Sequence, residues 1–140
     1  MKSAVFLTIL IIFFISLGVC CVGQSPNLEN TSWELDSYLS SIGHIVSPIS
    51  SAKITLEFKD GKISGSSGCN NYFAKYTTQG SSITFGLIGA TKMHCTVPSI
   101  MEQESTYLTL IESTKTYKVE GNKLKLMDNS GKVIFTFSKQ

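Results

Sequence analysis

The residues of this chain that could do chemistry are few, and the first set consists of cysteines and histidines. Cys69 with His94 or His44 could form a thiol nucleophile and its base, which requires a partly exposed thiolate and an orienting third group. His94 adjoins Cys95, and strand neighbours point to opposite faces, so these two do not easily share one site. Cys69, Cys95 and one histidine could bind a metal ion, but their spacing matches no zinc pattern of close pairs. We therefore predict no cysteine enzyme and no metal site.

Carboxylates and amides form the second set. Glu102 and Glu104 could be acid and base partners, but positions i and i+2 of a helix do not face each other. We interpret them as one capping carboxylate and one that is solvated or locally bonded. Asn70 and Asn71 could present amides to a ligand, yet this glycine-rich context is more typical of a turn or bulge in which asparagine adopts left-handed backbone. Neither pair predicts catalysis.

The elements that must position these residues are mostly short β-strands. Apolar and polar residues alternate, and Asp60-Gly61 favours a tight hairpin turn because both residues tolerate positive φ. About eight strands predict a mainly antiparallel β fold, either a strongly curved sheet or a half-open barrel, with one packed helix. The nine alternating segments from which these strands are drawn cover residues 33–38, 54–58, 63–66, 72–78, 82–85, 88–94, 116–119, 124–126 and 133–137.

The single predicted helix runs from Pro98 to about Ser113. Ser99 can cap it, and Glu102 three residues later can complete a capping box. Apolar residues then recur at helical spacing, so the helix should pack over the sheet. In each predicted element, the residues on the apolar face should form the core. These are Trp33, Leu56, Phe58, Phe73, Phe85, Met93, Leu108, Ile111, Leu124, Leu126, Phe135 and Phe137.

The first 23 residues have the order of an export signal. Lys2 is followed by an uncharged, strongly apolar stretch from Ala4 to Val22 and by small residues up to Gly23. As a helix this stretch would span roughly 28 Å, enough to cross a bilayer uncleaved. In either case, cleaved or uncleaved, Lys2 stays inside, and everything after Gly23 emerges outside the cytoplasm.

Three fates of this segment remain open. Leu17-Gly18-Val19-Cys20 resembles a lipobox, so Cys20 or Cys21 is a candidate for lipidation. Cleavage after Gly23 with secretion, and retention as a membrane anchor, are the alternatives. All three predict a cell-envelope protein that is exported, and either tethered to the membrane on its extracytoplasmic side or secreted.

Residues 24–31 form a polar linker, and residues 32–138 are long enough for one domain. Asn30-Thr31-Ser32 is a glycosylation sequon, which matters only in a host that glycosylates exported proteins. All twelve basic residues of the chain are lysine, against ten acids. The domain therefore lacks the arginines that bind phosphate and guanine in pairs of contacts, and we predict no nucleic-acid partner.

Several motifs together resemble the META domain (HslJ-like) family. The more specific ones are Gly68-Cys69-Asn70 and Thr91-x-Met93-x-Cys95; Trp33-Glu34-Leu35, Met101-Glu102-Gln103-Glu104 and Gly121-Asn122-Lys123-Leu124-Lys125-Leu126 accompany them in the right order. The resemblance implies a mainly antiparallel β fold with a helix, no established catalytic activity or cofactor, and a setting in envelope proteins linked to stress or drug tolerance.

These observations lead to three hypotheses about function. The first is a non-enzymatic cell-envelope accessory or interaction domain, which binds an unknown envelope protein through a sheet edge or surface patch. The alternative is a binder of a small apolar or lipid-like ligand within the curved sheet. The third is a hydrolase with an unrecognised site, which would require clustered titratable groups in a cleft.

Cys69 and Cys95 are the pair of cysteines that remains outside the signal region. An exported domain permits oxidation, and the strand at 82–85 can fold the two flanking segments against each other. We therefore predict a disulfide between them, with two buried free thiols as the alternative.

Overall fold

The computed structural model describes residues 26–140. The predicted export segment, with Cys20 and Cys21, lies outside the described residues, so its fate stays a prediction. Within residues 26–140, no helix has both the length and the apolar character needed to cross a membrane.

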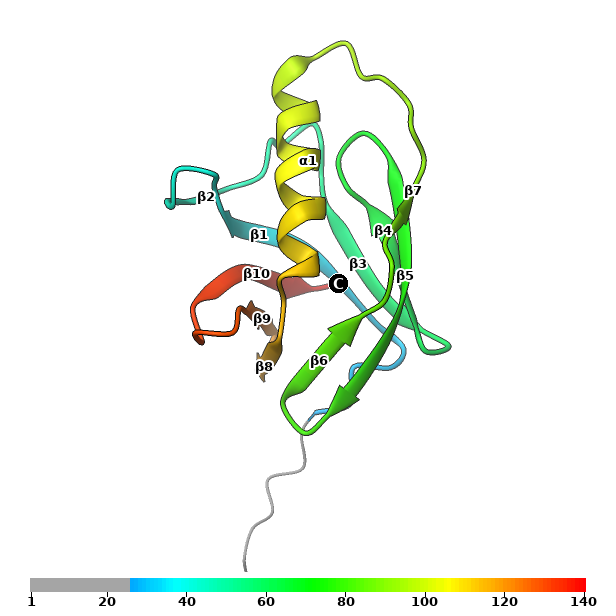
Figure 1. The fold of residues 1–140 in the computed structure, drawn as a ribbon, viewed down its shortest axis with the longest axis vertical. Coiled ribbons are helices and arrows are strands. Elements are labelled where there is room, and N and C mark those ends of the chain that lie inside the picture. The colour runs from blue at the N-terminus through cyan, green and yellow to red at the C-terminus, as the bar shows by residue number, and fades with distance from the viewer. Residues whose placement is uncertain (1–25) are drawn as a thin grey trace, which may run out of the picture.

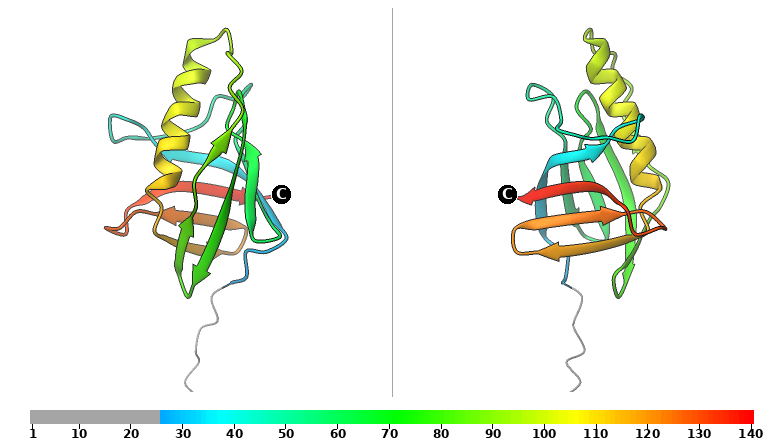
Figure 2. Two further views of the ribbon diagram at one scale, coloured as in Figure 1. Left: turned by 45° about the vertical axis from the view of Figure 1, so that its right-hand side comes forward. Right: turned by 90° about the vertical axis from the view of Figure 1, so that its left-hand side faces the viewer.

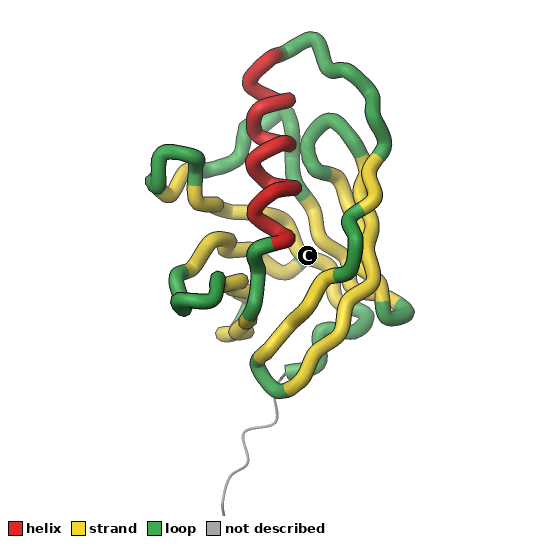
Figure 3. The backbone as a smooth tube through the Cα atoms, in the orientation of Figure 1, coloured by secondary structure: helices red, strands yellow, loops and turns green. Residues whose placement is uncertain are grey.

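The described part of the chain forms ten strands and one helix, all strand pairs being antiparallel (Figures 1 and 3). Most lie within a residue or two of the predicted bounds; β2 was not predicted, and the strand predicted over 88–94 is reduced to β7. In chain order the elements are β1 (Thr31–Leu39), β2 (Ile45–Val46), β3 (Thr55–Lys59), β4 (Lys62–Ser66), β5 (Asn71–Gln79), β6 (Ser82–Phe85), β7 (Gly89–Ala90), α1 (Pro98–Glu112), β8 (Thr116–Glu120), β9 (Lys123–Met127) and β10 (Val133–Lys139).

The sheet closes on itself. The strands follow the order β10-β9-β8-β6-β5-β4-β3-β1, and β1 also pairs with β10 from Trp33↔Lys139 to Tyr38↔Phe135. The two turned views of Figure 2 show the resulting barrel. The weakest junction is between β6 and β8, which pair only at Ser82↔Thr116. The predicted fold class is confirmed, and the barrel is a closed one of eight strands, with β2 and β7 added at its side.

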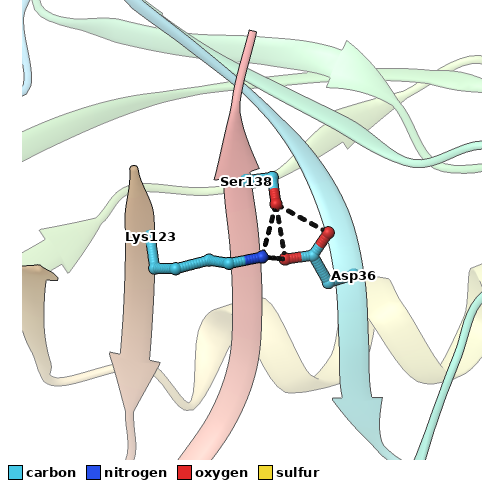
Figure 4. Close-up of polar contacts among 3 residues, drawn as sticks. All are labelled: Asp36, Lys123 and Ser138. Atoms are coloured by element: carbon cyan, nitrogen blue, oxygen red, sulfur yellow. Dashed lines mark hydrogen bonds and ion pairs between the residues drawn. The ribbon is translucent and has the colours of Figure 1, made fainter. Parts of the chain in front are cut away.

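A polar cluster on β1, β9 and β10 bridges the junction that closes the barrel (Figure 4). The register of β1 shifts between Leu35 and Ser37, and Asp36 lies at this irregularity. Its carboxylate is 2.7 Å from Lys123 Nζ and accepts a hydrogen bond from Ser138 Oγ at 2.7–2.8 Å. Because these groups are partly exposed, we expect a contribution of about 1 kcal/mol or less.

The barrel interior is a core of aromatic and aliphatic side chains. Of the predicted core, Phe85 and Leu108 are half-buried, and eight others are buried: Trp33, Leu56, Phe58, Ile111, Leu124, Leu126, Phe135 and Phe137. Burial of Phe73 and Met93 was predicted wrongly, since they are 61% and 59% exposed. On β5 the inward positions are Tyr72 and Ala74, so Phe73 faces outward. Met93 lies three residues beyond the end of β7, where no strand within residues 26–140 pairs with it and its side chain does not reach the barrel core.

Helix α1 packs on the barrel through Tyr107 and Ile111, both completely buried. Its predicted capping box is wrong. The helix starts at Pro98 after Val97, without a side-chain cap, because proline already suits the first helical position, where no amide hydrogen is needed. Ser99 therefore lies inside the first turn, and Glu102 is exposed.

Candidate functional site

A buried carboxylate on α1 is the centre of the main polar cluster. Glu104 is only 6% exposed, and its Oε2 accepts hydrogen bonds from Ser67 Oγ and Asn70 N at 2.7 Å and from Cys69 N at 3.2 Å. Burial raises the pKa of Glu104, but these bonds and the Asn70 side chain outweigh it and hold the pKa below its usual value. Glu104 is therefore an ionised, fully bonded anchor and a poor general base.

Asn70 connects this carboxylate to the loop after β7. Its Nδ2 donates to Glu104 Oε1 at 2.6 Å and to Met93 O at 3.1 Å. Its Oδ1 accepts from Met93 N at 2.7 Å and from Thr91 Oγ1 at 2.8 Å. With an exposure of 2%, Asn70 satisfies the main chain of the loop as a neighbouring strand would. The expected left-handed backbone is wrong for Asn70 and Asn71; in this turn it belongs to Gly68, at φ +115°.

A disulfide fastens the same loop a second time. Cys69 and Cys95 are bonded, with their Cα atoms 6.0 Å apart, so the predicted disulfide is confirmed. All six motif residues lie in this one region: Gly68, Cys69, Asn70, Thr91, Met93 and Cys95. We call these residues, with Ser67 and Glu104, the clamp.

Two further buried polar groups fix α1 beside the clamp. Gln103 receives a hydrogen bond from Ile49 N at 2.6 Å and donates to Ala52 O at 2.9 Å. Tyr107 shares a 2.6 Å hydrogen bond with Tyr72, whose hydroxyl also reaches Thr55 O at 2.8 Å. The helix is thus held by directional bonds to residues 49–52, to the turn at 67–70 and to Tyr72 of β5, which fixes its position as well as its burial.

An open groove of about 490 Å³ lies between residues 88–94 and α1. We call it the loop–helix groove. Its apolar lining consists mainly of Ile88, Ala90, Met93, Met101 and Leu108. Lys92, His94 and Ser105 add polar groups, while Asn70 and Glu104 contribute from the clamp. The clamp therefore holds one wall of the groove in place.

The structure separates the other residues considered for chemistry. Cys69 is in the disulfide, so it offers no thiolate, and His44 lies in the exposed turn between β1 and β2. Within residues 26–140, no three His, Cys, Asp or Glu side chains are grouped so as to hold a metal ion. The interpretation of Glu104 as solvated or locally bonded is wrong, because its partners are 34 to 37 residues away.

The role of Glu104 carried one overlooked signal in the sequence. It lies four positions after Ile100, three before Tyr107 and seven before Ile111, which places it in the apolar stripe of the helix. A charged residue in such a stripe must find partners when it is buried. The groove itself could not be anticipated, since it depends on how the loop after β7 passes the helix.

Comparisons with known proteins agree with this architecture. A solved NMR structure of a protein from Burkholderia xenovorans matches with a TM-score of 0.69 and 28% identity, covering 81% of this chain and 83% of that one. A second NMR structure matches with a TM-score of 0.61 and 20% identity over 79% and 90%, a likeness of fold alone. A search of curated proteins found no match. The model of the META domain matches residues 26–140, and the chain belongs to the META domain family.

Proposed function

We propose that this META domain is a non-enzymatic interaction domain of the cell envelope that binds a partner protein in the loop–helix groove. Its N-terminal segment would hold it at the outer side of the membrane. The setting of stress or drug tolerance that the resemblance implies belongs to the same proposal.

The observation that carries the proposal is an apolar groove with a rigid wall. Met93 is 59% exposed and lines the groove together with Ile88, Met101 and Leu108, and a group of exposed apolar side chains marks interaction sites. The disulfide and Asn70 fix the loop that bears it. A wall that is already ordered loses little conformational entropy when a partner binds, which favours recognition.

Binding has better support than catalysis or storage of a lipid-like ligand in the sheet. The cysteine of the motif is oxidised, and the buried carboxylate has all its partners. Large side chains such as Phe58, Phe135 and Phe137 fill the barrel interior. The open groove is therefore the better place for a ligand.

Export is supported by the disulfide, because such bonds persist in oxidising compartments. It agrees with the uncharged stretch behind Lys2.

Site-specific photo-crosslinking in intact cells tests the proposal. A benzophenone amino acid is placed at Met93 and, as a matched control, at Asn129, which is exposed in the turn between β9 and β10. We expect a discrete protein adduct from position 93 alone, and its loss when Leu108→Glu is added to the groove. Equal adducts at both positions, or none at either, would contradict the proposal.

A further inference from the structure

The strand that borders the groove has a free edge. β6 pairs with the second half of β5, and β7 continues beside its first half through Tyr72↔Ala90 and Phe73↔Gly89. Among residues 26–140, β7 has no other strand neighbour. In Figure 1 the chain leaves β7, arches upward and enters α1. Ala90 of β7 and the residues after it line the loop–helix groove opposite Met101, Ser105 and Leu108 of α1.

The main-chain groups on this edge follow from the ladder. Thr91 N donates to Asn71 O at 3.0 Å, and Met93 bonds the Asn70 side chain through both its N–H and C=O. Residues 91 and 93 thus direct their main chain toward β5. In an antiparallel ladder successive residues point to opposite sides, so Ala90 and Lys92 direct theirs away from β5. Among residues 26–140, neither main chain makes a hydrogen bond outside the sheet ladder. Ala90 lies opposite Tyr72 at a position of the ladder where the two residues do not bond each other, since the next residue, Thr91, bonds Asn71.

We propose that the groove binds an extended peptide segment of the partner, which adds itself as a strand to residues 88–92. This inference rests on the proposed function and specifies the partner's chemistry. The edge offers alternating donors and acceptors, and the complementary ligand is another extended main chain. A helix cannot serve, because its own main chain is already paired.

The size and lining of the groove set the kind of peptide. Five residues of edge span about 16 Å, which suits a segment of four or five residues. Alternate side chains of that segment face Met101 and Leu108, so every second residue should be apolar. The lining includes Met93 and Met101. Because methionine side chains adapt to different apolar partners, the groove should accept peptides of varied sequence.

A second copy of this chain is a poorer occupant. Full antiparallel pairing of residues 88–92 with the same residues of a second copy would place each Lys92 opposite Ile88. A charged side chain opposite an apolar one gains none of the stabilisation of aromatic, β-branched or opposite-charge pairs. The edge is also short, which limits pairing between copies.

A peptide selection followed by an N-methyl scan tests the inference. A random nine-residue phage library is panned against the full chain in detergent micelles, and an enriched peptide is labelled with fluorescein for anisotropy. Each of its amides is then methylated in turn. We expect Kd to weaken about tenfold, or about 1.4 kcal/mol, at every second residue, and to stay within about twofold at the residues between.

A substitution in the protein tests the main-chain hydrogen bond that the Ala90 N–H would donate to the peptide. Ala90→Pro removes only an outward N–H, which an edge strand tolerates, and should weaken binding about tenfold. Ala90→Val keeps the N–H and should bind as the wild type does. The fluorescence of Trp33 reports whether each variant is folded, and the N-methyl scan needs no variant at all.

The outcomes separate the two proposals. One outcome is a peptide that loses its affinity for the Met93→Glu or Leu108→Glu variant and yet shows no alternation of Kd in the N-methyl scan. This result would overturn the added strand and leave the groove as a binding site. Failure to enrich any peptide that is sensitive to these groove variants would overturn both.

Discussion

Replacing Glu104 by glutamine tests whether the buried carboxylate holds the clamp together. The variant keeps the size of the side chain but replaces one oxygen by NH₂. If the remaining oxygen takes the place of Oε2, the new NH₂ faces Asn70 Nδ2 where the two atoms now lie 2.6 Å apart. Asn70 cannot turn its amide to accept, because the N–H and C=O of Met93 already fix both its ends.

The expected loss in the free energy of unfolding is about 3 kcal/mol. One charge-assisted hydrogen bond becomes a contact between two donors, which costs about 1.5–3 kcal/mol. The bonds from Ser67, Cys69 and Asn70 remain but lose the charge that strengthens them. Such a loss is a large part of the 5–15 kcal/mol typical of a domain.

Urea unfolding followed by fluorescence measures this loss directly. Trp33 is the only tryptophan of the chain and is buried, so its emission reports the state of the barrel. Glu102→Gln is the matched control: it makes the same chemical change at an exposed position of the same helix and should shift stability by less than about 0.5 kcal/mol. A Glu104→Gln protein as stable as this control would refute the reasoning.

The pH dependence gives an independent check on the same variant. The pKa of Glu104 is lowered in the folded protein, so its contribution is complete above the unfolded value of about 4.3. It is lost as pH falls through the folded pKa. Glutamine does not titrate, so the stability gap between the two proteins should be constant from about pH 6 to 8 and shrink below about pH 4. A gap that stays unchanged in acid would contradict an ionised Glu104.

Four further outcomes are expected. Changing both cysteines of the disulfide to serine should cost about 3.5 kcal/mol in urea unfolding, the chain entropy of a loop of this length. Trp33→Ala should cost about 3–5 kcal/mol, measured by circular dichroism. Gly65→Ala should destabilise by about 3 kcal/mol or more, because the new Cβ would lie 2.0 Å from the Thr55 carbonyl oxygen, whereas Gly86→Ala, with 3.7 Å of room, should be close to neutral. A reporter enzyme that works only outside the cytoplasm, fused after Gln140, should be active.

Local sequence patterns predicted most of the fold, because its strands and turns depend on the alternation of apolar residues and on turn residues that are neighbours in the chain. The turn at Asp60-Gly61 has the positive φ values expected, +52° and +69°, and the strands on either side pair as a hairpin. Tyr72 and Phe73 show the limit. Where two aromatic residues are adjacent in a strand, the sequence does not decide which of them faces the core. Here Tyr72 faces the core, where its hydroxyl shares a hydrogen bond with the buried Tyr107.

The candidate site was less predictable because its bonds join distant segments. Composition and compartment were enough to pair Cys69 with Cys95. The partners of Glu104 could not be found in this way, since they depend on how α1 meets the turn before β5. An acid in the apolar stripe of a helix signals that buried partners exist, but not which residues they are.

The arrangement of the clamp connects the family motif to the free edge of β7. Thr91 and Met93 turn toward Asn70, so the residues between and before them, Lys92 and Ala90, must turn their main chain outward. Asn70 occupies the place of a neighbouring strand on one side only. The motif thus completes the hydrogen bonds on the inner side of this segment and leaves the outer side open. Residues that take part in no reaction can in this way hold a strand edge in the conformation that binds. Because this edge is ordered before a partner arrives, binding loses less conformational entropy.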